Sequence, residues 1–196
     1  VLKSSKLEQV YKQRRFKPYT KQQIESILVK MLKVVPEYCR VMRIMREIPP
    51  SYLVAGTKRI DLRKEIEQQI KNNHIKLQEI RSREVGIAIR DGRNIDKNLK
   101  FKIKKYKASQ GTEYFLEITN KDNILFGLLR LRIPDKPFLE ELKDAVIVRE
   151  LHVYGRSIAV GMQGKAWQHK GLGKQLMRAA EKIAKRLFRK IDIISF

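Results

Sequence analysis

The segment from Leu172 to Leu187 is a strongly amphipathic run that follows two glycines and precedes another apolar stretch. Its apolar residues recur at the spacing of an α-helix with one buried face, and they are Leu172, Leu176, Ala180, Ile183, Ala184 and Leu187. Strand-like AVIVRELHVYG lies before this helix, and KIDIISF lies after it. A strand, a turn, a helix and a further strand form a β-α-β crossover, which requires that the helix packs on a sheet.

Most of the strand-like sequence lies between residues 85 and 155. Five segments are rich in β-branched and aromatic residues and are separated by Gly, Asn, Asp or Pro: VGIAIR, LKFKIKKYKAS, TEYFLEIT, ILFGLLRLRI and AVIVRELHVYG. Lys100, Lys102 and Lys104 occupy alternate positions, so the second segment is predicted to expose a basic face to water. We therefore place a domain boundary near residues 83–91 and predict that an α+β domain with a mixed sheet follows it.

The N-terminal part is predicted to be helical and extended. A capping box of Thr20 and Gln23 opens YTKQQIESILVKMLKVV, whose apolar residues keep helical spacing until Pro36 ends the helix. CRVMRIMREIPP alternates arginine with apolar residues and indicates a short strand or an extended segment. A second helix is predicted over residues 61–73, DLRKEIEQQIKNN.

Charge and cysteine content narrow the classes of function. The 196 residues include 44 Lys and Arg against 21 Asp and Glu, which gives a net charge of +23. This excess attracts polyanions, and its spread over the chain indicates a folded nucleic-acid-binding protein with several basic faces. A solvated surface adapted to salt or heat is the alternative. The single cysteine, Cys39, excludes an internal disulfide and a multi-thiolate cluster, and no ligand spacing suggests a metal site.

Targeting signals are lacking in the sequence. No window is long and apolar enough for a membrane span, and the first residues do not have the layout of a signal peptide. We therefore expect a cytoplasmic protein without membrane contact. The chain starts at Val1 rather than Met and stops within an apolar run, so we expect a piece of a longer protein.

The stretch QHKGLGKQL has the residues of an anion-binding turn. Amides in the first turn of a helix have no partner within the helix, and the helix dipole adds partial positive charge there. Gly171 and Gly173 allow a diphosphate to approach the backbone, and Lys170 and Lys174 add charge. The spacing is neither G-x-G-x-x-G nor G-K-[ST]. It resembles the Q/R-x-x-G-x-G/A loop, here starting at Gln168, with which Gcn5-related acetyltransferases (GNAT) hold the pyrophosphate of CoA; an ordinary turn is the alternative.

Five blocks in the same order resemble the Elongator complex catalytic subunit 3 family: RVMRIMREIPP, IRSREVGI, ILFGLLRLR, IVRELHVYG and QHKGLG. The resemblance covers nearly the whole chain. Members join a radical S-adenosylmethionine (SAM) domain to a GNAT domain and modify the wobble uridine of tRNA at its fifth carbon, starting from acetyl-CoA. The resemblance implies a truncated, archaeal-like member with three parts: the C-terminal part of the radical SAM domain (1–60), a linker (61–90) and a GNAT-like domain (91–196) that is incomplete at its C-terminus.

The same resemblance implies the partners. Acetyl-CoA and tRNA are expected to bind this chain, whereas S-adenosylmethionine and a [4Fe-4S] cluster are expected in the parent protein and not on residues of this chain. Elongator-type subunits or a second copy are possible partners. Two departures are visible: zinc-binding cysteines that often precede the REVG block are missing from HIKLQEIRSREVG, and the family's later Tyr-rich block would lie beyond Phe196.

Carried over residue by residue, the resemblance gives two sets of acetyl-CoA-binding residues. The strand set is Glu150, Leu151, His152 and Val153, and the loop set is Gln168, Lys170, Gly171, Leu172, Gly173, Lys174 and Gln175. Glu150 suits either a general base or an ion-pair partner of an arginine, and His152 either lines the cofactor or packs against its neighbours. Catalysis is assigned to no residue.

Candidate tRNA contacts are the basic residues of three blocks, namely Arg40, Arg43, Arg46, Arg81, Arg83, Lys100, Lys102 and Lys104. Some of these must be structural, because alternate positions of an extended chain point to opposite sides. Two other functions stay open. One is a histone-type protein lysine acetyltransferase, which so basic a surface disfavours because it repels lysine-rich substrates. The other is a tRNA-binding scaffold without turnover.

Overall fold

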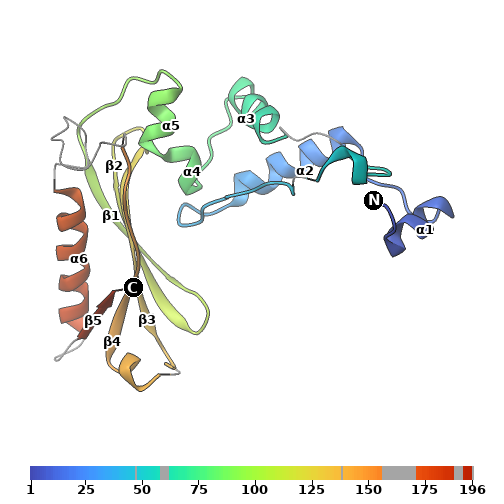
Figure 1. Ribbon diagram of the computed structural model, residues 1–196. Helices are drawn as coiled ribbons and strands as arrows, with labels where there is room; N and C mark the ends of the chain where they lie inside the picture. Colours follow the sequence, from blue (N-terminus) through green and yellow to red (C-terminus); the bar gives the residue numbers. More distant parts are fainter. Residues whose placement is uncertain (47, 58–61, 138, 156–170, 188–191, 196) are drawn as a thin grey trace. The chain divides into compact units, whose positions relative to one another are not determined.

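A computed structural model describes residues 1–46, 48–57, 62–137, 139–155, 171–187 and 192–195 of the chain (Figure 1). The chain divides into two compact units, Val1–Ser82 and Arg83–Phe196. None of the helices in these described ranges has the length and apolar character that crossing a membrane would require.

The N-terminal unit is mainly helical. Its helices are α1 (Lys6–Lys12), α2 (Lys21–Val34), η1 (Pro50–Tyr52) and α3 (Leu62–Asn72), and α4 (Ile80–Arg83) begins at its end. The predicted capping box on α2 is confirmed: Thr20 Oγ1 accepts from the Gln23 amide at 3.2 Å, and Gln23 Oε1 accepts from the Thr20 amide at 2.8 Å. The core lies between α2 and α3 and contains the buried residues Leu32, Leu62, Ile66 and Ile70.

The arginine-rich segment CRVMRIMREIPP is extended rather than a strand, because residues 39–46 belong to no helix or strand. Glu79, whose side chain is fully buried, holds this segment to the start of α4. One carboxylate oxygen accepts from the amides of Val41 at 3.1 Å and Arg81 at 2.9 Å, and the other accepts from the Ser82 amide at 2.8 Å. A single buried carboxylate thus satisfies three backbone donors and fixes two segments of the sequence to each other.

The C-terminal unit is a mixed five-stranded sheet with helices. It comprises α5 (Val85–Arg90), β1 (Lys100–Lys107), β2 (Gly111–Thr119), β3 (Leu125–Pro134), η2 (Glu140–Leu142), β4 (Ala145–Val153), α6 (Leu172–Leu187) and β5 (Asp192–Ser195). The strand order is β1-β2-β3-β4-β5. The first four strands are antiparallel, and β5 runs parallel to β4 after the crossover through α6 (Figure 1). The predicted α+β fold with a mixed GNAT-type sheet is confirmed.

One segment was predicted wrongly. VGIAIR has the composition of a strand, but it forms the helix α5. Its buried residues are Val85 and Ala88, three positions apart, which is helical spacing. Six residues are too few for periodicity to separate a short helix from a buried strand, so β-branched composition misled the prediction.

The core of this unit lies between the sheet and α6. Leu116, Phe126 and Leu129 of the central strands are fully buried, and α6 packs against β2, β3 and β4. On α6, the predicted buried residues Leu172, Leu176, Ala180 and Ala184 are 5% exposed or less. Leu187 departs from the prediction with an exposure of 46%. Tight burial of one face fixes the position of the first turn of α6 relative to the sheet.

We predict that Glu79→Gln weakens the N-terminal unit by about 2–3 kcal/mol, because the new NH2 group cannot accept the amide hydrogen bonds that the lost oxygen accepted. Hydrogen exchange at the amides of Val41, Arg81 and Ser82 should accelerate. Urea unfolding and amide exchange measure the two effects.

Glu67→Gln is the matched control, since Glu67 pairs with Arg63 at 2.7 Å but its side chain is 39% exposed. Its cost should be about 0.5 kcal/mol. If both variants lost the same free energy of unfolding, Glu79 would not hold the two segments together.

Candidate functional site

Strand β4 changes its partners midway along its length. Its first four residues, Ala145 to Val148, pair with β5 on one side, while β3 runs along the other. The register with β3 then shifts: Arg130 faces Glu150 and Leu131 faces Val148, which leaves Arg149 as an extra residue in β4. Arg149 is therefore a β-bulge, a feature that bends a strand and ends regular pairing.

Beyond the bulge, residues 150–153 pair with β3 and with no other described strand. Among the described residues, no strand pairs with their outer edge, and backbone N–H and C=O groups at such an edge require hydrogen-bond partners. A ligand with amide groups of its own can extend the sheet at such an edge, as peptides do in strand addition.

The first turn of α6 lies beside the end of this free edge. A Cβ built on Gly173 would be 3.8 Å from Cγ2 of Val153, the last residue of β4. The first hydrogen bond within the helix runs from the Gln175 amide to the Gly171 carbonyl at 3.0 Å. The amides of Leu172, Gly173 and Lys174 precede this bond and have no acceptor within the helix, so they favour the binding of an anion.

Two glycines give this corner its shape. Gly171 has a φ of +72°, a left-handed conformation that glycine adopts without strain, and a Cβ built there would meet no described atom within 4 Å. Gly127 of β3 lies under α6, where a Cβ would be 3.3 Å from Cδ1 of Leu176 and 3.2 Å from the His152 carbonyl oxygen. The absence of a side chain at 127 lets α6 lie close to β3 and β4.

The side chains of the free edge alternate between two faces of the sheet. Val153 contacts the α6 side, whereas Glu150 points to the opposite face and bonds to Arg130, with 2.7 Å between Oε2 and Nε. Burial disfavours the charged form of Arg130, but its hydrogen bond and attraction to Glu150, with smaller contributions from Tyr106, outweigh this and raise its pKa above the ordinary value. Of the two roles left open for Glu150, the ion pair with an arginine is the one observed.

A second ionic cluster lies at the bulge itself. Arg149 and Arg132 both donate to Oε1 of Glu113, at 2.7 and 2.8 Å, and the Glu113 side chain is 1% exposed. The carboxylate therefore ties the bulge residue of β4 to β2 and β3. We infer that this cluster stabilises the bulged backbone conformation.

The predicted acetyl-CoA residues that the structure describes form one corner of the C-terminal unit. Glu150, Leu151, His152 and Val153 make up the free edge, and Gly171, Leu172, Gly173, Lys174 and Gln175 form the turn and start of α6. His152 is exposed, and its ring stacks on Tyr154 with 4.4 Å between centroids. Gln168 and Lys170 lie outside the described residues.

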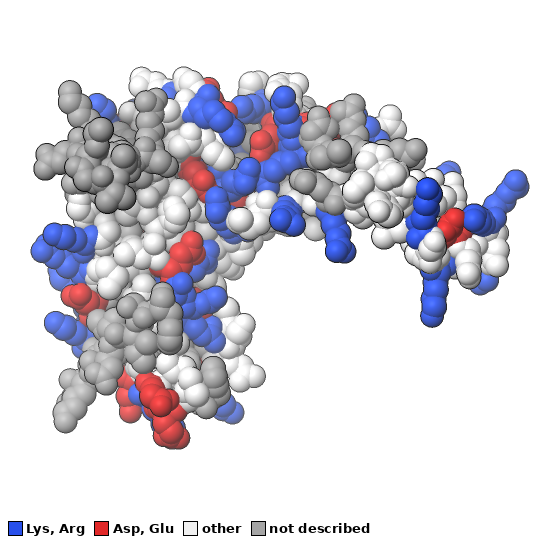
Figure 2. All heavy atoms as spheres, in the orientation of Figure 1, with Lys and Arg blue, Asp and Glu red and all other residues white. Residues whose placement is uncertain are grey.

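The candidate tRNA residues differ in exposure. Those that are exposed are Arg40, Arg43, Arg46, Lys100, Lys102 and Lys104, whereas Arg81 is half-buried. Arg83 is 4% exposed and bonds to Glu117 at 2.8 Å inside the C-terminal unit, which gives it a structural partner. Figure 2 shows Lys and Arg side chains over both units rather than gathered in one patch.

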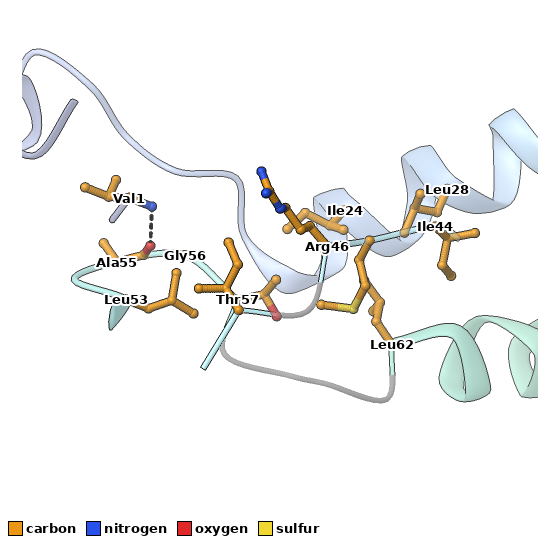
Figure 3. A pocket seen from close by; sticks show the side chains of 12 residues that line it. Val1, Ile24, Leu28, Ile44, Arg46, Leu53, Ala55, Gly56, Thr57 and Leu62 are labelled. Carbon is orange, nitrogen blue, oxygen red and sulfur yellow. Dashed lines mark hydrogen bonds between the residues drawn. The ribbon is translucent and has the colours of Figure 1, made fainter. Parts of the chain in front are cut away.

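A pocket of about 320 Å³ lies in the N-terminal unit (Figure 3). Apolar side chains from α2 and from the chain that leads to α3 line it, together with Arg46 and Thr57. It does not involve the free edge of β4 or the first turn of α6. In the described ranges, no three or more His, Cys, Asp or Glu side chains are grouped so as to hold a metal ion.

Sequence reasoning missed several residues that shape the corner. Gly127 had a usable signal, because a glycine inside an apolar strand pattern often marks a close approach of backbone. Arg130, Arg132 and Glu113 had none, since their pairing depends on strand register. Arg149 was noticed only as a neighbour of Glu150, and its bulge is visible only in the paired sheet.

A mixed sheet with a bulge in its fourth strand, and with a helix N-terminus beside the end of that strand, is the architecture of an acyltransferase. The model of the acetyltransferase (GNAT) family matches residues 81–195, and that of the radical SAM C-terminal domain matches residues 1–72. The chain belongs to the acetyltransferase (GNAT) family. Its resemblance to the Elongator complex catalytic subunit 3 family is also confirmed.

The relatives are similar along the whole chain. A tRNA uridine(34) acetyltransferase of Methanocaldococcus jannaschii is 36% identical over 99% of this chain and 37% of its own length. A tRNA uridine(34) acetyltransferase of Dehalococcoides mccartyi is 37% identical, and the match covers 94% of this chain and 41% of the relative. Elongator complex protein 3 of Schizosaccharomyces pombe is 34% identical, and the match covers 100% of this chain and 37% of the relative. The chain thus spans about two fifths of the length of these proteins.

Among solved structures, archaeal Elp3 of Methanocaldococcus infernus with an N-terminal deletion is similar over the full chain. The TM-score is 0.88 at 34% identity, and the match covers 47% of that protein's chain.

We predict that Gly127→Val destabilises the C-terminal unit by about 1–3 kcal/mol, because the new side chain must displace Leu176 or the β4 backbone. Thermal unfolding measures the loss. Near-ultraviolet circular dichroism should report the altered packing of α6.

Gly86→Ala serves as the control, since Gly86 lies in α5 with nothing within 4 Å of a built Cβ. This change should stabilise the helix by up to about 1 kcal/mol. Unchanged stability in Gly127→Val would contradict the close packing of α6 on β3.

Proposed function

We propose that this chain is the acetyl-CoA-binding part, and a part of the RNA platform, of a tRNA wobble-uridine acetyltransferase. The observation that supports this most is the end of β4, where a free strand edge and the first turn of α6 meet. Those two elements match the two chemical halves of CoA. The names of the relatives supply the substrate class.

The free edge at residues 150–153 suits the pantetheine arm. This arm carries two amides, each with a donor and an acceptor, and a strand edge offers both kinds of group in alternation. Recognition through the backbone leaves the side chains of β4 free for other tasks. Glu150 uses its side chain to bind Arg130 rather than a ligand.

The first turn of α6 suits the pyrophosphate. Its early amides and the helix dipole favour negative charge, and glycine at 171 and 173 leaves room for the phosphate oxygens. The thioester of bound acetyl-CoA supplies an activated acetyl group. In this proposal, the described residues bind and orient that group, while deprotonation is assigned to none of them.

The proposal places tRNA on basic surfaces of each unit. In the N-terminal unit Arg40, Arg43 and Arg46 are exposed on the extended segment that Glu79 holds. In the C-terminal unit the exposed lysines of β1 offer a second surface, although Lys102 is partly engaged by Glu117 at 3.8 Å. Contacts of this kind position a phosphate backbone without reading its sequence.

The radical half of the proposed reaction is assigned to no residue of this chain. The match of residues 1–72 to the radical SAM C-terminal domain supports a parent protein with that chemistry. With one cysteine, Cys39, the chain cannot supply the thiolates that bind an iron–sulfur cluster. S-adenosylmethionine and the cluster therefore belong to the proposed parent and not to the site at β4 and α6.

A lysine acetyltransferase acting on proteins is the second candidate, because the GNAT fold is compatible with it. Two observations oppose it. The net charge of +23 repels lysine-rich substrates, and the carboxylate best placed in sequence to deprotonate an amine, Glu150, is bonded to Arg130.

We expect the native protein that carries this chain to release CoA from acetyl-CoA only when tRNA is present. Gly173→Glu should reduce that release at least about 100-fold, because the new carboxylate occupies the anion-binding turn and repels the pyrophosphate. Thiol detection of free CoA, with and without tRNA, measures both effects.

The control is Gly86→Glu, which adds the same charge at an exposed position on α5. Its hydrolysis should equal that of the unmodified protein. If the protein acetylated lysine peptides and tRNA had no effect on that reaction, the result would favour a protein acetyltransferase. Binding of tRNA without hydrolysis would support the scaffold instead.

A further inference from the structure

A row of basic side chains runs along the outer face of α6. Lys174, Arg178, Lys182 and Arg186 follow one another at intervals of four residues, and Lys185 lies beside them. All five are exposed. At a rise of 1.5 Å per residue, these charges stand about 6 Å apart along roughly 18 Å of helix. We call these five residues the α6 cation row.

The α6 cation row is held rigidly. Leu176, Ala180 and Ala184, on the other side of the helix, are 1% exposed or less because they pack against the sheet. A helix with one face fully buried cannot rotate or fray to hide its charges. The row is therefore a fixed linear array rather than a set of mobile side chains on a loose segment.

Several cations on other described helices pair with acids, whereas those of the α6 cation row do not. On other described helices, cations pair with acids one turn away, as in Lys12 with Glu8, Lys21 with Glu25 and Arg63 with Glu67. The members of the row form no ion pair with any described residue. Glu181 is the single acid of α6 and bonds to none of them within ion-pair distance.

The sequence around α6 also has many more basic than acidic residues. From residue 156 to residue 190 the chain has ten Lys and Arg and one acid, Glu181. This stretch carries nine of the 23 net positive charges of the protein. A solvated helix face requires no such excess, because alternating signs keep a surface soluble with less self-repulsion.

We propose that the α6 cation row binds the phosphodiester backbone of the RNA substrate, an inference that rests on the proposed tRNA-modifying function. A straight, evenly spaced array of cations fits a polyanion with regularly repeated charges. The row lies on the C-terminal unit and is separate in sequence from the arginines of residues 40–46 and from the lysines of β1. It gives the acyltransferase unit a second RNA contact besides the lysines of β1.

The phosphates of bound CoA are the other anions that the α6 cation row could bind. Lys174 lies in the first turn, within reach of a pyrophosphate, and is therefore left out of the test. Arg178, Lys182 and Arg186 begin a full turn further on and extend to about 18 Å from Lys174 along the axis. A diphosphate at the first turn cannot engage all three, whereas a nucleic-acid strand can.

The test compares two triple variants in the native protein that carries this chain. The row variant combines Arg178→Gln, Lys182→Gln and Arg186→Gln, which keeps good helix formers in α6. The matched control combines Lys97→Gln, Lys136→Gln and Lys143→Gln, which removes the same charge from exposed positions elsewhere in the unit. Circular dichroism and thermal unfolding confirm that both variants are folded.

We would measure the affinity of each variant for transcribed tRNA at several salt concentrations. Affinity for acetyl-CoA would be measured at a single salt concentration. The row variant should bind tRNA about tenfold more weakly, and its slope of log K against log salt should be shallower by about 2. The control variant should keep the slope of the unmodified protein, and acetyl-CoA affinity should be unchanged in both.

Equal slopes in the two variants would overturn the inference and leave the proposed function intact. Loss of acetyl-CoA affinity with unchanged tRNA binding would also overturn it and assign the row to CoA phosphates. Failure of the unmodified protein to bind tRNA at all would reject the proposed function itself.

Discussion

Backbone hydrogen bonding in β4 is the constraint from which the rest of the site follows. The strand pairs on both sides at Ile147 and Val148, bulges at Arg149, and continues with β3 as its one described partner. Polar backbone groups at a half-paired edge need partners, and we propose that acetyl-CoA supplies them for residues 150–153. The glycine turn and α6 then place helix amides where that edge ends.

Ionic contacts on the sheet face opposite α6 support this arrangement. Glu113 receives both Arg132 and Arg149, and Glu150 receives Arg130, so each acid joins the bulged strand to β2 or β3. Of the two acids, Glu113 is buried, and removing the cations that pair with a buried carboxylate carries a strong penalty. Their role here is consistent with fixing the register of β4. The α6 cation row, in contrast, forms no ion pair with any described residue.

Sequence patterns were sufficient for regular elements and for the glycine turn. The capping box at Thr20 is a local motif, the stripe from Leu172 to Ala184 is a local period, and the four long strands follow from local composition and turn residues. All three signals are readable without tertiary contacts. VGIAIR was misassigned because a six-residue segment of this composition fits a helix and a strand alike. The bulge at Arg149 and the partner of Glu150 depend on which residues face each other across strands. No local signal encodes those pairings, and Gln168 and Lys170 lie outside the described residues.

Hydrogen–deuterium exchange with and without acetyl-CoA tests the central claim most directly. The account predicts that the ligand slows exchange at two separate segments, the amides of residues 150–153 and those of residues 172–174. Amides of β1, on the far edge of the same sheet, should be unaffected. Protection of α6 alone would contradict the role of the free edge. Protection of neither segment would show that acetyl-CoA does not bind at the end of β4.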